Sequence, residues 1–274
     1  MQELTNLYLE IANEQRRVEQ GIARDQRTTE QEIARDQRAV EQRIADERLQ
    51  EETLNAYLGR MADLLLHESL HESQAEDDVR AVARARTLMT LRRLDARRKG
   101  DLLRFLYDTK LVSGDEPIID LSGADLNGAD LSWSLLGGVN LERVNLEEAN
   151  LQTSYLAEAH LFGAKLTHAD LSNVNLSKAD LFAADLTRAK LVNANLSHSN
   201  PSVDDEGNLV EVDSNRDNLC GADLSHAILM DADLTDADLD NANLTNAEGI
   251  TEQQMSRVKS RMNMIMPDGT MRTE

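Results

Sequence analysis

The sequence predicts an α+β protein, divided by domains, in which a helical N-terminal half precedes a β-solenoid. Leucine recurs at every fifth position from Leu121 to Leu196 and again from Leu219 to Leu244. The first 51 residues instead carry an 11-residue repeat, which suits a long helix. Arginine, glutamate and glutamine dominate before Pro117, whereas alanine, asparagine, aspartate and leucine dominate after it. We therefore place the boundary between the two halves at residues 114–117.

Residues 1–51 are expected to form one long, charged helix. Four isoleucines begin the segments "IANEQRR", "IARDQRT", "IARDQRA" and "IADERLQ": Ile11, Ile22, Ile33 and Ile44. Eleven residues make about three helical turns, so these side chains share one narrow stripe. A stripe this thin leaves two interpretations open, a solvated stalk and an oligomerising coiled coil.

Residues 52–114 predict a small helical bundle. The apolar stripe widens here, as a packed helix requires, and its members are Leu54, Tyr57, Leu58, Met61, Leu64 and Leu65. A polar break at 71–78 precedes a second helix at about 78–99, for which Gly100 is the expected C-terminal cap. A third, short helix is expected to begin at Asp101.

Residues 79–110 carry ten basic residues against three acids. Such a patch suits a polyanion, either nucleic acid or the anionic lipid of a membrane contacted peripherally. It lacks the interleaved glycine and aromatic residues that reading of bases uses, so specific recognition is not expected. The same arginines also suit a solvated face, or a face that pairs with the acidic half, and both interpretations stay open.

The repeat of residues 115–249 has the unit A-(D/N)-L-x-x. In the run from Leu121 to Leu196, a small or β-branched residue stands two positions before each leucine of the five-residue series, and an aspartate or asparagine usually stands directly before that leucine. One large and one small inward residue suit a short extended side followed by a corner. Several sides close into a coil, and coils stack through backbone hydrogen bonds at about 4.8 Å. Residues 199–217 interrupt the run with about 18 extra residues, which suit a binding loop or an idle insertion.

With 22 matching units, residues 117–249 resemble the pentapeptide-repeat family. The resemblance implies a right-handed, four-sided β-helix with twenty residues per coil. It also implies that residues 250–274 form a C-terminal cap, with a short helix near 251–261 and a turn at Pro267–Gly269. The helical segment at 52–112 is similar to one that precedes the repeats in some bacterial members.

The formal net charge of −21 is unevenly placed. Residues 115–248 hold 25 acids and six bases, a net charge of −19, whereas residues 1–114 sum to −3 and residues 249–274 to +1. An acidic surface repels nucleic acid and favours basic partners. We therefore expect a protein partner with a basic surface and no nucleic acid bound directly to the β-helix. The alternative is that the charge only keeps a regular surface soluble.

The composition also predicts the compartment. A single cysteine, Cys220, excludes an internal disulfide, and it is expected to be buried or at a corner. No apolar run approaches the roughly 18 to 20 residues that span a bilayer, and the first residues lack a basic n-region. We therefore expect a soluble, cytoplasmic protein that contacts a membrane only peripherally, through its basic helices.

The implied twenty-residue coil predicts which outward side chains stack on one another. Phe162 should stack on Phe182, and Leu135 on Tyr155 with Trp133 near the same corner. Such residues suit a docked helix, a dimer contact or a partner-binding hot spot. Together with the acids of the inserted loop and of the C-terminal repeats, they form the candidate interaction surface: Trp133, Leu135, Tyr155, Phe162, Phe182, Asp204, Asp205, Glu206, Asp231, Asp233, Asp236, Asp238 and Asp240.

One motif suggests catalysis. The segment "HESLH" at residues 67–71 fits H-E-x-x-H, in which two histidines on one helix bind zinc and the glutamate activates water. No third ligand or substrate domain accompanies His67, Glu68 and His71, and no phosphate loop, serine nucleophile motif or cysteine pair occurs. We expect no enzyme activity, cofactor or metal, with a zinc hydrolase as a remote alternative.

The leading hypothesis is a non-catalytic scaffold, in which a rigid acidic β-helix is joined to a helical oligomerisation module and forms a homo-oligomer. The family resemblance supplies the alternative. Some bacterial pentapeptide-repeat proteins mimic DNA and occupy the DNA-binding saddle of type II topoisomerases such as gyrase, which they protect or inhibit. The charge of −19 suits that function, whereas the short solenoid and the long helical half do not.

Overall fold

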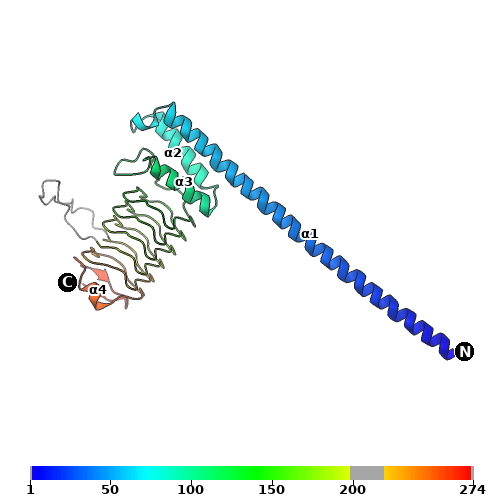
Figure 1. Cartoon of the computed structure of the whole chain (residues 1–274). Helices are drawn as coiled ribbons and strands as arrows, with labels where there is room; N and C mark the ends of the chain where they lie inside the picture. Colours follow the sequence, from blue (N-terminus) through cyan, green and yellow to red (C-terminus); the bar gives the residue numbers. More distant parts are fainter. Residues whose placement is uncertain (1, 198–218, 273–274) are drawn as a thin grey trace. The chain divides into compact units, whose positions relative to one another are not determined.

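The computed structural model describes residues 2–197 and 219–272, with side chains from residue 29 onward and at Glu14, Arg16 and Arg17. The chain divides into two compact units, residues 1–52 and 53–274. One helix, α1 (Gln2–Leu66), continues across this division (Figure 1). The predicted stalk and the first helix of the predicted bundle are therefore one uninterrupted helix.

The 11-residue repeat is helical throughout. Ile33, Val40 and Ile44 keep 52%, 52% and 46% of their surface exposed in the single chain. Val40 follows Ile33 by seven residues and Ile44 follows Ile33 by eleven, which are close to two and three whole helical turns. The three side chains therefore form one stripe along α1. Ile11 and Ile22 of the same predicted stripe lie outside the described side chains. The described part of the stripe is thus half exposed.

The bundle contains the end of α1, α2 (Asp78–Leu91) and α3 (Ala96–Asp108), with a 3-10 turn, η1 (Leu70–Glu72), after α1. The predicted stripe of α1 is buried at four of its six positions, Leu54, Tyr57, Met61 and Leu64. The hydroxyl of Tyr57 lies 2.7 Å from Thr87 Oγ1, which joins α1 to α2 inside the core. Burial raises the pKa of Tyr57 above its ordinary range, so this hydroxyl stays protonated.

The predicted helix at 78–99 is wrong, because α2 ends at Leu91 and α3 begins at Ala96. Asp95 accounts for the break. Its side chain accepts a hydrogen bond from the backbone N–H of Arg98 at 2.9 Å and so caps a new helix. Gly100 consequently lies inside α3 and is not the C-terminal cap that we expected.

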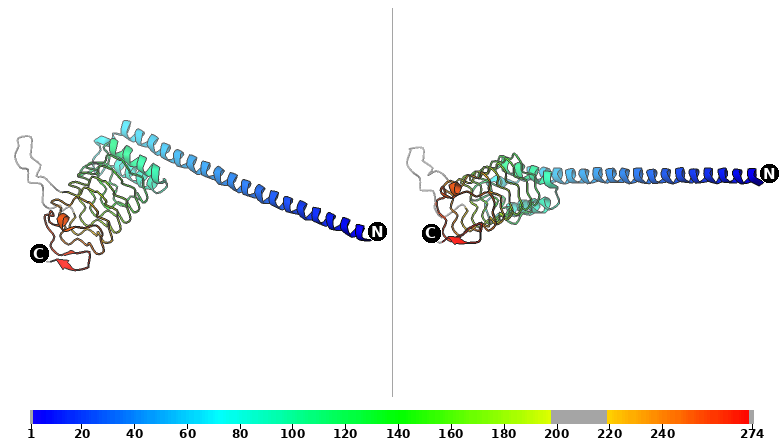
Figure 2. Two further views of the ribbon diagram at one scale, coloured as in Figure 1. Left: turned by 60° about the horizontal axis from the view of Figure 1, so that its bottom comes forward. Right: turned by 90° about the horizontal axis from the view of Figure 1, so that it is seen from below.

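Residues 119–197 and 219–248 form a stack of coils that follows the chain from the bundle toward the C-terminus (Figure 2). Parallel bridges join positions twenty residues apart, as in the series Asp125, Asn145, Lys165 and Asp185. Each repeat leucine is at most 1% exposed, and wherever the structure describes it the residue two positions before the leucine is buried as well. These bridges and this core confirm a β-solenoid with four repeats in each coil.

Each corner of a coil is a turn that the repeat unit itself builds. The N–H of Ala149 donates to the carbonyl oxygen of Leu146 at 3.1 Å, and Glu148 between them has a φ of 56°. A positive φ at this place makes the corner a type II turn. Asn145, directly before the leucine, accepts a hydrogen bond from the backbone N–H of Glu147 at 3.1 Å. The aspartate or asparagine of the unit therefore closes the turn from the outside.

The insertion leaves the stack in register. Asp185 pairs with Asp223, and Asn195 pairs with Asp233, at a spacing of 38 residues. This spacing is one coil of twenty plus the 18 extra residues expected from the sequence. The predicted binding loop at 199–217 lies outside the described residues.

The bundle covers the N-terminal edge of the solenoid. The backbone N–H of Asp130 donates to Ala96 in α3 at 2.9 Å, and the N–H of Asn140 donates to Val112 at 2.7 Å. An uncovered edge would present unpaired N–H and carbonyl groups to other chains. The helices before the solenoid therefore end its ladder of hydrogen bonds on this side.

The last coil pairs with the C-terminal segment, which contains α4 (Glu252–Met255) and an antiparallel hairpin of β1 (Met264–Ile265) and β2 (Met271–Arg272). The N–H of Leu239 donates to Ser260 at 2.9 Å, and that of Leu244 to Ile265 at 2.9 Å. The helix predicted near 251–261 has only four residues, because residues 257–260 pair with the coil instead. The predicted turn at 267–269 is present between β1 and β2.

Candidate interaction face

One outward column of the solenoid, with the corners beside it, contains six of the thirteen side chains predicted to bind a partner. Successive parallel bridges join its members, which are Leu135, Tyr155, Asn175, Asn195 and Asp233. We call this column and the corner residues beside it the Leu135 face. Four steps of about 4.8 Å give the column a length of about 19 Å.

The N-terminal end of the Leu135 face is apolar. Trp133 and Leu135 are each 75% exposed, and Tyr155 is 46% exposed. A Cβ at Gly137 would lie 2.8 Å from Tyr155 Cε1, so glycine at 137 is what lets the tyrosine ring lie against the coil above it. Three large apolar groups therefore lie in two consecutive coils, and the bridge between Leu135 and Tyr155 confirms that these two residues occupy one outward column as predicted.

The opposite end of the same face is acidic. Asp231 and Asp236 occupy the corners on either side of Asp233, and all three are exposed. Asp233 accepts hydrogen bonds from the backbone N–H and the hydroxyl of Thr235, which orient its carboxylate. Between the two ends, Asn193 Nδ2 donates to Asn173 Oδ1 at 3.2 Å in the neighbouring corner column. The face thus passes from aromatic through amide to carboxylate groups.

Two predicted members of the interaction surface do not belong to it. Asp238 is only 8% exposed, in a column that pairs with Ser260. Asp240 accepts hydrogen bonds from the hydroxyl of Ser260 and the backbone N–H of Met262. The carboxylate of Asp240 therefore holds the C-terminal segment on the last coil, and the backbone at Asp238 pairs with the same segment. The loop acids Asp204, Asp205 and Glu206 lie outside the described residues.

The two phenylalanines stack as predicted but at another corner. The rings of Phe162 and Phe182 have centroids 5.6 Å apart and planes 10° apart, and the guanidinium of Arg143 lies 5.0 Å from the Phe162 centroid. These contacts cover part of both rings, and Phe182 keeps 37% of its surface exposed. This stack is therefore separate from the Leu135 face.

The basic helices are attached to the first coil. Arg84 donates to the carboxylate of Asp120 at 3.2 Å and to the carbonyl of Ser122 at 2.8 Å. Lys99 donates to the carbonyl of Asn127 at 2.9 Å. Arg104 donates to Ser134 Oγ at 2.9 Å and to the carbonyl of Asp130 at 3.0 Å. These three cations therefore pair with the acidic half, which is one of the interpretations that the sequence left open.

A model of the pentapeptide repeats matches residues 119–152, 159–197 and 218–247 of this chain, in eight copies. The repeat segment belongs to the pentapeptide-repeat family. Its resemblance to solved members is modest. HetL, a pentapeptide-repeat protein involved in heterocyst differentiation regulation in Nostoc sp. PCC 7120, is 29% identical over 56% of this chain and 70% of its own, with a TM-score of 0.31.

Two further solved pentapeptide-repeat proteins match this chain with lower TM-scores. Rfr23 from Cyanothece 51142 is 29% identical over 47% of this chain and 64% of its own, with a TM-score of 0.23. QnrB1, a plasmid-mediated fluoroquinolone resistance protein, is 21% identical over 52% of this chain and 77% of its own, with a TM-score of 0.22. No curated protein sequence matches the chain.

The H-E-x-x-H motif does not lie on one continuous helix, which corrects the geometry on which the zinc hypothesis depended. α1 ends at Leu66, and Ser69 takes a left-handed conformation with a φ of 49°, which separates His67 from His71. Glu68 accepts a hydrogen bond from Arg60 at 2.8 Å. Among the side chains that the structure describes, no three His, Cys, Asp or Glu residues are grouped to hold a metal ion. Nor does any helix within residues 2–197 and 219–272 have the length and apolar character that crossing a membrane requires.

Register explains what sequence reasoning missed about the pentapeptide-repeat surface. The aromatic residues and the acids were predicted as members of one interaction surface but not as members of one column, because an insertion lies between them in the sequence. Counting 38 residues from Asn195 places Asp233 below Leu135 and Tyr155 in the same column. The signal that identifies the face was therefore present in the repeat spacing.

Proposed function

We propose that this protein is a non-catalytic interaction scaffold that binds a basic protein partner on the Leu135 face and oligomerises through α1. The observation that carries the proposal is one face with exposed aromatic groups at one end and exposed carboxylates at the other. An arginine-rich segment suits both ends, since its guanidinium groups stack on Trp and Tyr rings and pair with carboxylates. A right-handed coil, as the family implies, and a capping role for residues 250–272 are parts of the same proposal.

Trp133 makes this proposal directly measurable, because it is the only tryptophan in the chain. A nonapeptide of alternating arginine and serine, titrated into the full-length protein, is expected to change Trp133 fluorescence in a saturable way. The lysine counterpart should bind more weakly, because lysine lacks the planar fork and the stacking surface. High salt should weaken the binding of both peptides, since dissolved ions screen the attraction between the carboxylates and the peptide cations.

A matched pair of triple variants separates the face from the overall charge. Asp231→Asn, Asp233→Asn and Asp236→Asn together should weaken binding about tenfold, by losing charge-assisted pairs worth roughly 1.4 kcal/mol in total. Glu142→Gln, Glu147→Gln and Glu148→Gln also remove three negative charges, but from other corners. They should weaken peptide binding less than threefold. Equal weakening by the two sets would contradict binding at the Leu135 face.

DNA mimicry is the second candidate, and the charge of −19 on residues 115–248 is the observation that favours it. An acidic rod can substitute for DNA if its charges, rather than one face, are what the partner contacts. A supercoiling assay with gyrase and the full chain, at low and moderate salt, tests this. Salt-sensitive inhibition, or protection from a quinolone, would support mimicry. No effect at an excess of protein over enzyme would count against it for that enzyme.

A further inference from the structure

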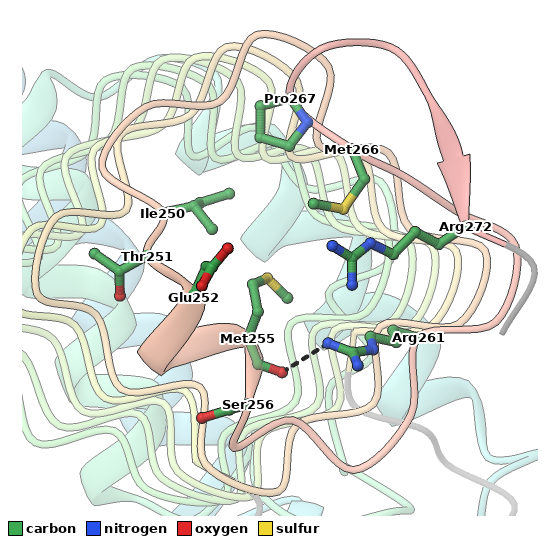
Figure 3. A pocket seen from close by; sticks show the side chains of 9 residues that line it. All are labelled: Ile250, Thr251, Glu252, Met255, Ser256, Arg261, Met266, Pro267 and Arg272. Carbon is green, nitrogen blue, oxygen red and sulfur yellow. Dashed lines mark hydrogen bonds between the residues drawn. The ribbon is translucent and has the colours of Figure 1, made fainter.

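A cavity of about 370 Å³ opens where the C-terminal segment meets the last coil. Its walls are mainly apolar, with Ile250, Met255, Met266 and Pro267 contributing (Figure 3). Met255 is only 5% exposed and forms part of the solenoid core. The volume falls within the range of about 300 to 1,000 Å³ that is usual for small-molecule sites.

Two guanidinium groups reach this apolar cavity. Arg261 and Arg272 both line it, and Figure 3 shows their side chains extending toward the same interior space. Arg261 Nη1 donates to the carbonyl oxygen of Met255 at 3.1 Å, which fixes the position of that guanidinium. Arg272, on β2, makes no such bond within the described residues and is the more available donor.

Neither guanidinium lies within 4.0 Å of a carboxylate oxygen among the described side chains. Asp268, four residues before Arg272, accepts hydrogen bonds from the hydroxyl and the backbone N–H of Thr270, which together with a smaller contribution from the charge of Arg272 lower the pKa of its carboxyl. Glu252 lines the opposite side of the cavity. Residues 249–274 carry a net charge of +1 on a chain whose net charge is −21, so this is a locally cationic place.

We propose that this cavity binds a carboxylate attached to an apolar body of about ten non-hydrogen atoms, a size suited to its volume. The carboxylate would accept hydrogen bonds from Arg272 and from the remaining N–H groups of Arg261, the pairing that the guanidinium fork favours. The apolar body would pack on the methionine side chains, which adapt to varied shapes. A free fatty acid and the C-terminal residue of a peptide share this chemistry.

The methionines provide the measurement. In full-length protein labelled with ¹³C at the methionine methyl groups, octanoate and N-acetyl-leucine are titrated separately, each beside its neutral amide. The methyl signals of Met255 and Met266 should shift with the acids, and the amides should bind at least tenfold more weakly. Tighter binding of octanoate would identify a fatty acid as the source, and tighter binding of N-acetyl-leucine a peptide terminus.

Arginine variants test the proposed contact. Arg272→Gln should weaken octanoate at least tenfold and Arg272→Lys by less, because lysine keeps the charge without the fork. Arg257→Gln, an equal charge change at an exposed residue outside the cavity, should have no effect. The signal of Met264, which is fully buried in the same segment, reports whether each variant keeps its fold. Absent shifts at Met255 and Met266, or equal binding of acid and amide, would overturn the proposal.

Discussion

Thr153 occupies a corner that its own side chain disfavours. Its φ is 58°, and a β-branched residue in this left-handed region costs about 1 to 2 kcal/mol. The next two residues in the same corner column are Asn173 and Asn193, and asparagine tolerates this conformation. Asn193 already donates to Asn173 at 3.2 Å, so an asparagine at 153 would also extend a ladder of amides.

Thr153→Asn is therefore expected to raise the free energy of unfolding by about 1 kcal/mol. The midpoint of urea denaturation, followed by circular dichroism, measures the change. Asn173→Thr is the matched control, and it should lower the stability by a similar amount. A lower midpoint for Thr153→Asn would show that the hydroxyl makes a contact worth more than the strain.

The aspartates beside the repeat leucines make the solenoid sensitive to acid. The hydroxyl of Ser132 donates to Asp130 and, against the opposing effect of burial, holds the pKa of Asp130 below its ordinary value. Burial alone would raise the pKa of Asp120, Asp170 and Asp185, but hydrogen bonds from the serine or threonine two residues on lower it overall. Four carboxylates are thus more acidic in the folded chain than in the unfolded one.

A lowered pKa in the folded state stabilises the protein above the unfolded pKa of about 3.9, and this contribution is lost as the pH falls through the folded pKa. Urea midpoints should therefore decline below about pH 4. Asp130→Asn and Asp170→Asn together should flatten that decline and change little at pH 7, because asparagine closes the same turn at Asn145 and Asn175. An unchanged decline in the double variant would assign it to other carboxylates.

At the scale of elements, Gly100 controls how α3 meets the solenoid. A Cβ at this position would lie 2.0 Å from the carbonyl oxygen of Asp130, so any side chain would displace the helix from the first coil. Gly100→Ala is expected to cost about 2 to 4 kcal/mol, as overpacking against backbone does. Gly59→Ala is the control in α1, where a Cβ has nothing within 4 Å and should stabilise the helix by about 0.5 to 1 kcal/mol. Urea denaturation of both variants distinguishes close packing from helix propensity.

The same elements show how far sequence reasoning extends. One unit repeated 22 times supplies the core leucine, the turn and usually the aspartate or asparagine that closes it, so the local preferences of the unit favour the solenoid. The bundle has no such redundancy. A glycine after a helical stretch indicates either a C-terminal cap or a place where another part of the backbone packs closely against the helix. Only the structure, in which the carbonyl of Asp130 lies beside Gly100, shows that the second explanation applies.

The candidate face was predictable in composition but only partly in location. Asp233 and Asp238 have the same place in the repeat unit, yet one is exposed and the other is buried. The difference comes from residues 257–262, which pair with the last coil beside Asp238 and Asp240. That segment has no repeat of its own, so periodicity alone does not show which carboxylates it covers.

For the whole molecule, the proposed scaffold requires more than one copy of the chain. Ile33, Val40 and Ile44 are each about half exposed on one stripe of α1, and a narrow stripe on a lone helix contributes little to its stability. An 11-residue repeat brings such stripes together in a nearly straight coiled coil. Two or more acidic solenoids would then be held by one helical assembly, which raises the effective concentration of their binding faces.

Ile33→Asn, Val40→Asn and Ile44→Asn together should therefore convert an oligomer to a monomer in sedimentation equilibrium of the full-length protein. Arg35→Asn, Gln42→Asn and Asp46→Asn form the control, because each lies two residues further on and about 200° around the helix, and they should leave the oligomer intact. Loss of the oligomer should also weaken binding to a multivalent arginine-rich partner while leaving the affinity for a single nonapeptide unchanged. A wild-type monomer at concentrations up to about 100 times those in the peptide titration would instead make α1 a stalk.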